Sequence, residues 1–431
     1  MVTNLISLLT FFPETVGQGI GPNGTAGGTV STGAEWEAAE LAGTAFQMPH
    51  LQSTISIDGI TETELEPEFV RTRFFQTQPT TPGLSNVTFG FSSNLTGRGV
   101  ALAAGTTATA TRLGRGLLNA LGGVHYTETV TLAGGGHTTL TINVDDVSTL
   151  AVGACIAPVD PATGLSHPRV ITAIADPAVT LDTVLPFTPA DGDVALGGET
   201  YFIDEDVIGD TSSSLGSTLS AVYQNGSNGS AGWEVNGIKL GLTSIQFARN
   251  EFPTLEFEAL GARFSDPSVG PDPTMPTVDY PTPPPIGPDT SIIVVDASST
   301  ALGTPCNGTV SIDPGVPVVP LECMADNLGD MEGRSLYSSE PAATSIEVDI
   351  YPRENQWFTD KAADTNKKLS VIKHGASGNT FGFFAQTCEI QNVVPGSDQF
   401  TSSNITLRAV EHNATTATTA LERSKFRIFL G

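Results

Sequence analysis

The chain has 431 residues, of which 46 are Gly and 29 are Pro, and only 15% are charged. Acidic residues outnumber basic residues by 46 to 19, which gives a formal net charge of -27. This length allows two or three domains with a sizeable core, and the many turn-forming residues favour β-structure over a helical bundle. The charge argues against tight, static binding of nucleic acid, because such binding needs a basic surface.

The first part of the chain predicts an arm, then strands, then a helix. We interpret residues 1–44 as an N-terminal arm that begins with an apolar segment. In residues 86–94 apolar and polar side chains alternate, which is typical of a half-buried strand. Residues 111–123 predict a helix, because leucines recur every four residues and a glycine follows them: Leu113, Leu117, Leu121 and Gly122.

The pattern changes at residue 138, and this change sets the expected domain boundaries. From 138 to 200, short apolar runs are separated by Gly, Pro and Asp, which is typical of a small closed β-barrel. We expect this barrel to be inserted into a first domain that comprises residues 45–137 and 201–265. Residues 266–289 are too rich in proline for a strand or helix and predict an extended linker. A second domain is expected at 290–431.

The two domains show the same order of elements: a strand, a helix and a long hairpin. The first hairpin is expected at 237–261 and the second at 379–412, each with a proline in or near its turn. In the second domain a strand at 344–352 precedes a helix that is expected to carry Trp357 and Leu369. The shared order predicts that the two domains are copies of one structural unit.

No motif in the sequence indicates a catalytic, metal-binding or nucleotide-binding site. GxSxG, HExxH, CxxC and P-loop patterns do not occur, and the six histidines are dispersed. We therefore expect no enzyme activity, no catalytic residue, no cofactor and no metal site. The sequence has no apolar run of 18 residues, so no membrane span is expected. The spacing of Cys306 and Cys323 leaves open whether they form a disulfide.

The segments GIKLGLTSIQFARNEFPTLEFEALG (237–261) and NTFGFFAQTCEIQNVVPGSDQFTSSNITLRAVEH (379–412) resemble the major tail tube protein of long-tailed, siphovirus-type phages. The ending KFRIFLG (425–431) is similar to the last strand of that family. Residues 138–200 are similar to the small SH3-like barrels of phage tail proteins. The resemblance implies a mainly β fold with two tail-tube β-sandwich or barrel domains, each with a flanking helix, and an SH3-like β-barrel insertion.

The resemblance also implies a structural protein of the virion tail that is assembled in the host cytoplasm. Its rings would stack into a tube around a tape-measure protein, with tail terminator and distal tail proteins as further partners, and the tube would conduct double-stranded DNA. Because two domains share one chain, three chains would fill the six places of a ring. Two alternatives remain from the residues alone. One is a β-rich bacterial or viral surface adhesion module, which the Asn-X-Ser/Thr sequons support, and the other is a β-rich hydrolase or lectin.

The tube lumen would be lined by the polar faces of the long strands. An acidic lining would repel DNA phosphates and so discourage DNA from sticking. Alternation alone does not distinguish such a lining from an ordinary solvated face. The lumen-facing candidates are Thr254, Glu256 and Glu258 in the first domain and Glu347, Asp349 and Thr406 in the second, with Arg408 in phase as a basic exception.

Overall fold

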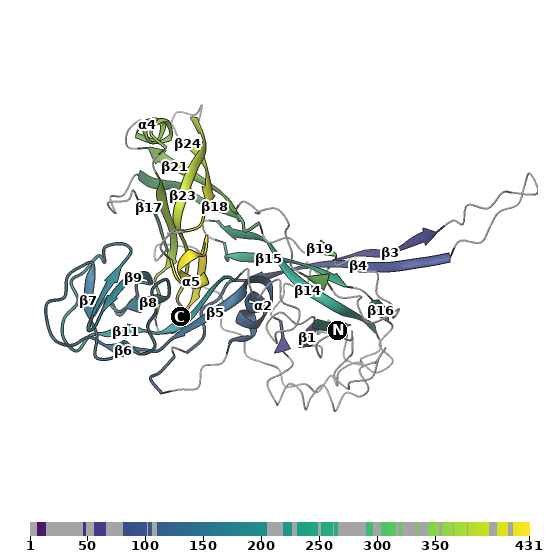
Figure 1. The fold of residues 1–431 in the computed structure, drawn as a ribbon, viewed down its shortest axis with the longest axis horizontal. Coiled ribbons are helices and arrows are strands. Elements are labelled where there is room, and N and C mark those ends of the chain that lie inside the picture. Colours follow the sequence, from purple (N-terminus) through teal and green to yellow (C-terminus); the bar gives the residue numbers. More distant parts are fainter. Residues whose placement is uncertain are drawn as a thin grey trace, which may run out of the picture.

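The fold is mainly β, with large antiparallel sheets, as given by a computed structural model (Figure 1). Residues outside the following ranges are not described, and these include the predicted linker at 266–289. The structure describes residues 7–13, 46–48, 56–65, 81–100, 102–105, 110–204, 219–225, 231–248, 251–261, 263–265, 290–295, 303–315, 319–320, 334–335, 344–352, 356–364, 366–376, 378–395, 403–412 and 417–431.

Two sets of elements, which we call the first and second units, account for most of the large sheet. The first unit comprises β1 (Ser7–Pro13), β3 (Ser56–Leu65), β4 (Thr81–Asn94), α2 (Arg112–Leu121), β13 (Leu219–Asn225), β14 (Ala231–Phe247) and β15 (Thr254–Gly261). The second unit comprises β17 (Thr290–Val295), β18 (Gly303–Asp313), β21 (Thr344–Pro352), α4 (Gln356–Ala362), β22 (Lys367–Lys373), β23 (Phe381–Pro395) and β24 (Ser403–Ala409).

The two units have the same topology. Strands of the first unit pair in the order β3–β4–β15–β14–β13–β1. Strands of the second unit pair in the order β18–β21–β24–β23–β22–β17, and every pairing in both units is antiparallel. The counterparts also follow each other in the same order along the chain, and α2 packs on β14 as α4 packs on β23. Even a register shift recurs, after Leu242 in the β14–β15 hairpin and after Ile390 in the β23–β24 hairpin.

The predicted helix at 111–123 is α2, and its ends follow from local chemistry. The Thr111 side chain accepts a hydrogen bond from the Gly114 backbone N–H, which satisfies one of the free donors of the first turn. Gly122 ends the helix with a φ of 85°, a left-handed conformation that suits glycine. The three predicted leucines are buried, so the apolar stripe faces the core.

Two expectations for secondary structure need correction. Strand β1 lies within the expected N-terminal arm, pairs with β13 and buries Leu9 and Phe11, so this part of the arm belongs to the first unit. Leu369 lies in β22 and not in the helix that carries Trp357, because that helix ends at Ala362 and a turn follows. Alternation in a strand and the spacing of a helix are hard to separate over so few residues.

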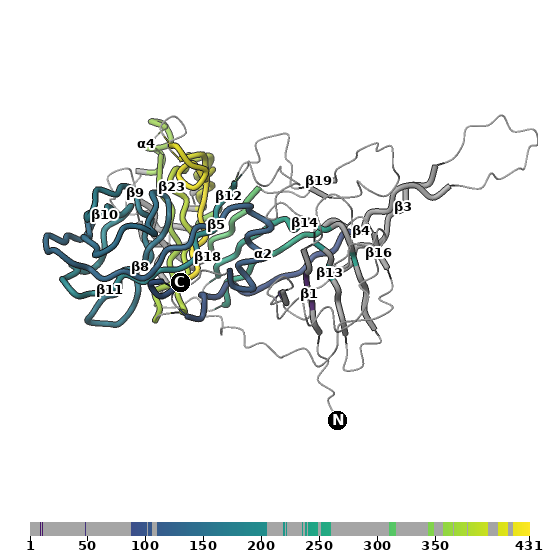
Figure 2. The backbone as a smooth tube through the Cα atoms, turned by 60° about the horizontal axis from the view of Figure 1, so that its bottom comes forward, coloured from purple at the N-terminus to yellow at the C-terminus, as the bar shows by residue number. Residues whose placement is uncertain are grey.

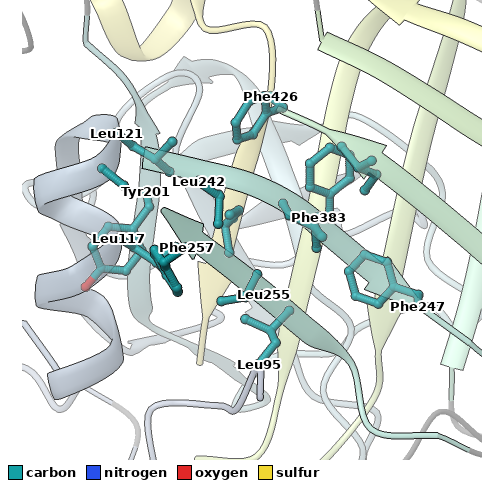
Figure 3. Close-up of a cluster of buried hydrophobic side chains, with 14 of the residues drawn as sticks. Leu95, Leu117, Leu121, Tyr201, Leu242, Phe247, Leu255, Phe257, Phe383 and Phe426 are labelled. Atoms are coloured by element: carbon teal, nitrogen blue, oxygen red, sulfur yellow. The ribbon is translucent and has the colours of Figure 1, made fainter. Parts of the chain in front are cut away.

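A single hydrophobic core joins the two units. The β14 end Ile245–Phe247 pairs with Val310–Ile312 of β18, so the sheet continues from one unit into the other. Beneath this junction the rings of Phe247 and Phe381 stack, with centroids 6.0 Å apart. Figure 3 shows the cluster in which side chains of α2 and of both units meet.

A separate six-stranded sheet, the small sheet, lies at one end of the molecule (Figures 1 and 2). It has its own core, and it also packs on the second unit through Cys155, Val170, Phe384 and Phe429. Its strands are β6 (Val130–Thr131), β7 (Thr141–Asn143), β8 (Cys155–Pro158), β9 (Arg169–Ala175), β10 (Ala178–Leu181) and β11 (Val194–Leu196).

The remaining elements connect these parts. β12 pairs with both β5 and β25, which places the C-terminal strand in the large sheet beside β23. The free thiols of Cys155 and Cys388 are buried, whereas the side chains of Cys306 and Cys323 lie outside the described residues. The remaining bounds are β2 (Phe46–Gln47), β5 (Gly122–Thr127), β12 (Gly198–Ile203), β16 (Arg263–Ser265), β19 (Val319–Pro320), β20 (Arg334–Ser335), α5 (Ala420–Arg423) and β25 (Arg427–Leu430).

Candidate functional site

A row of polar residues crosses seven strands of both units. Residues that pair directly across antiparallel strands point to the same face of a sheet, so register alone identifies the row. We call this face the polar face. In strand order β4, β15, β14, β18, β21, β24, β23, the row is Asn94, Thr254, Gln246, Ser311, Glu347, Thr406 and Asn392.

The next row is apolar on six of these strands and points the other way, into the core, while its position on β4 is occupied by the buried Ser93. Its members are buried or packed against the core, and they pair across the same junction between the units. This alternation shows that the core occupies one face of the continuous sheet and that the polar row lies on the opposite face. The apolar row is Leu255, Ile245, Ile312, Ile346, Leu407 and Ile390.

The sheet brings the seven candidate residues of the sequence onto this one face. Thr254, Glu347 and Thr406 belong to the polar row itself. Glu256 and Glu258 follow along β15, where small residues flank them. The flanking residues are Ser92 and Ser244 beside Glu256, and Gly90 and Gly241 beside Glu258.

The other two candidates are placed by register on β21 and β24. Asp349 pairs with Asn404, although its side chain is not among those described. Arg408 is exposed and pairs with Ser345 on one side and with Glu389 on the other, so the basic exception has an acidic neighbour in register.

Several residues of this face escaped the sequence analysis. Gln246 and Glu389 stand out of phase with the apolar residues of their hairpin strands, and that alternation could have identified them. Ser311 and Asp313 could not be found, because β18 has too little alternation to be recognised as a strand. The described carboxylates on the face are those of Glu256, Glu258, Asp313, Glu347 and Glu389.

The end of β14 pairs with a strand on each of its two edges, whereas the equivalent end of β23 has an open edge among the described strands. Gln246 pairs with Thr254 on one side and with Ser311 on the other, so both edges of the β14 end are occupied. The register shifts described above make Val393–Pro395 the counterpart of Ile245–Phe247. Within the described part of the chain this segment of β23 pairs only with β24, and the side chain of Val394 is 48% exposed.

No protein-family model and no curated protein matches the chain. Among the described residues, no group of three or more His, Cys, Asp or Glu side chains is arranged to hold a metal ion. None of the described helices is long and apolar enough to cross a membrane.

A second polar cluster, around Glu199, is buried at the start of α2. Its carboxylate accepts hydrogen bonds from Arg98 Nε at 2.9 Å, from Thr111 N and Oγ1 at 3.0 Å each, and from the Tyr201 hydroxyl at 2.5 Å. Burial raises the pKa of Glu199, and these donors oppose that rise. Because both carboxylate oxygens of Glu199 accept hydrogen bonds within the fold, the cluster fastens α2 to β12.

Proposed function

We propose that this chain is the subunit of a tail tube of the siphovirus type, a structural component of the virion. Its rings stack around a tape-measure protein, meet tail terminator and distal tail proteins at the ends, and conduct double-stranded DNA. On this proposal the two units are tail-tube domains and the small sheet is an SH3-like barrel. The observation that best supports the proposal is the contact between the two units.

This contact is head-to-tail, and each chain also has an equivalent edge and an equivalent strand through which the same contact would form with another chain. The end of β14 in the first unit takes up β18, the first hairpin strand of the second unit. The equivalent end of β23 is open, and β3, the counterpart of β18, pairs only with β4 among the described strands. Strand addition to an open edge joins separate chains, and a head-to-tail contact that closes on itself generates a ring.

The number of strands suits a conduit for DNA. Each unit supplies four strands to the continuous sheet. In the first unit these are the pair β3–β4 and the hairpin β14–β15, and in the second unit they are the pair β18–β21 and the hairpin β23–β24. Three chains with six units would give roughly 24 strands, which, at a spacing of about 4.8 Å and a tilt of about 36°, close to a diameter near 45 Å. Such a barrel remains wider than a DNA duplex after side chains are added.

The polar face would line this conduit. Most of its side chains are short or acidic, and the carboxylates outnumber the basic residues. DNA phosphates would therefore meet like charge at the wall, which favours passage over binding. The apolar face would remain covered by the core of each unit.

Electron microscopy of the purified chain tests the proposal. We expect rings or tubes with three chains per ring and pseudo-sixfold symmetry. Chains that stay monomeric at high concentration, or rings with six chains, would refute it.

A substitution at the open edge tests the mode of assembly. The Val393 N–H donates a hydrogen bond to the Asn392 side-chain oxygen at 3.0 Å, and Val393→Pro removes this backbone donor beside the open edge. We expect a folded monomer from this variant and normal rings from the control Val394→Ala, which keeps the backbone donor. Normal rings from Val393→Pro would contradict pairing at this edge.

A further inference from the structure

The small sheet meets the second unit at a contact that we call the seam. Its apolar part is a cluster of its own, distinct from the two larger cores, and consists of Cys155, Ala157, Val170, Ile372, Phe384 and Phe429. Beside this cluster the backbone N–H of Ser166 donates a hydrogen bond to the Gly375 oxygen at 2.9 Å. Because the small sheet buries a core of its own, it can separate from the second unit without unfolding.

Two histidines contact each other at the seam. His167 lies just before β9 on the side of the small sheet, and His374 directly follows β22 of the second unit. Their ring centroids are 4.4 Å apart, and both side chains are buried. Both ring nitrogens of His167 are buried without a hydrogen-bond partner among the described residues, so no hydrogen bond joins the two rings. On the other ring, Nδ1 lies 3.3 Å from the Ser166 backbone oxygen.

The charged groups around this histidine pair are mainly cations. Arg169 of β9 and Lys373 of β22 are both buried. Asp160 faces His167 from the small sheet, but it also accepts hydrogen bonds from its own loop, and Asp182 partly offsets the charge of Arg169. A proton on either ring would therefore be added at a buried site beside positive charge, which disfavours it.

We propose that the seam is an acid-sensitive joint, at which protonation of His167 and His374 releases the small sheet from the second unit while both cores stay folded. In the closed seam, burial and then the charge of Arg169 lower the pKa of His167 to about 4. Burial and then the neighbouring histidine lower the pKa of His374 to about 4 as well. In the open state both rings meet water, and the pKa of each returns towards its ordinary value of 6.5. The open state therefore binds more protons between about pH 4 and 6.5, so acid favours opening.

Two buried thiols distinguish opening of the seam from global unfolding. Cys155 lies in the seam, whereas Cys388 lies in the core that joins the two units. Opening of the seam should expose Cys155 alone, and global unfolding should expose both. The full chain is labelled with dithiodipyridine, a thiol reagent that remains active in acid, and peptide mass spectrometry measures the rate at each thiol. Each rate is divided by that of the same thiol in the urea-unfolded chain at the same pH.

The labelling of Cys155 should rise steeply in acid. With a pKa of about 4 in the closed seam and 6.5 in the open state, each histidine should raise the open fraction about 20-fold between about pH 7 and pH 5. Cys388 should stay protected over this range. A rate at Cys155 that does not rise, or a parallel rise at Cys388, would overturn the proposal.

A matched pair of variants assigns the effect to the histidine pair. His167→Phe keeps an aromatic ring against Phe187 and His374 but cannot be protonated, so it should reduce the rise at Cys155 at least about fivefold. The control is His137→Gln, because the hydrogen bonds of this histidine stay within the small sheet, and it should leave the rise unchanged. An undiminished rise in a folded His167→Phe variant would overturn the assignment. If that variant does not fold, the comparison of the two thiols in the unaltered chain still decides the proposal.

Discussion

The stacked pair Phe247 and Phe381 makes the connection between the two units measurable. Phe247 belongs to the first unit and Phe381 to the second, neither is exposed, and their rings lie 19° from parallel. Replacing either by Ala should lower the free energy of unfolding by about 3–5 kcal/mol, because it removes a large buried side chain and leaves a cavity. The double variant should lose about 0.5–1.5 kcal/mol less than the sum of the two, which is the coupling typical of an aromatic pair.

Urea denaturation of the dispersed chain, followed by fluorescence and circular dichroism, gives these values. Phe252→Ala is the matched control, since Phe252 is 48% exposed in the turn of the first hairpin, and it should change the free energy of unfolding by less than about 0.5 kcal/mol. The reasoning fails if Phe247→Ala is as mild as the control. It also fails if the coupling is zero while both single variants are costly, because the units would then be energetically independent.

Three further predictions follow from other parts of the fold. Gly114→Ala should destabilise the chain by about 1–3 kcal/mol in the same denaturation assay, because its Cβ would lie 1.8 Å from the Tyr201 hydroxyl oxygen; unchanged stability would contradict this close packing. Burial lowers the pKa of His167 and of His374 to about 4, so the unfolded chain binds more protons between about pH 4 and 6.5, and stability should fall as pH falls through this window. His167→Phe should flatten that slope in thermal melts, and an equally steep slope would refute the assignment. Glu256→Lys with Glu258→Lys should leave tubes intact but slow DNA ejection, most at low salt, whereas the matched Gln pair should not; equal ejection rates would refute a repulsive lining.

The sequence predicted those elements whose periodicity is strong. The leucine spacing and Gly122 located α2, and alternation located both long hairpins. Pairing between units could not be predicted, because the contact of β14 with β18 joins segments on either side of the predicted linker and neither carries a local signal for the other.

The burial of polar residues such as Arg427 and Glu199 also could not be predicted from the local sequence pattern. Arg427 lies between the apolar residues Phe426 and Ile428, so alternation alone would place it on a solvated face. The small sheet and the C-terminal segment cover that face, and the arginine becomes fully buried. Likewise, nothing near Glu199 in the sequence indicates that Arg98 and Thr111 will reach it.

The docking of the small sheet has a consequence for how the protein is made on the ribosome. Ser166 bridges to Gly375, 209 residues further along the chain, and Cys155 and Val170 bury Phe384 and Phe429, so residues of the small sheet find these partners only after a long stretch of synthesis. Contacts of such long sequence separation form slowly. The nascent chain therefore keeps this surface uncovered until β23 and β25 have emerged, because β25 pairs with both β12 and β23.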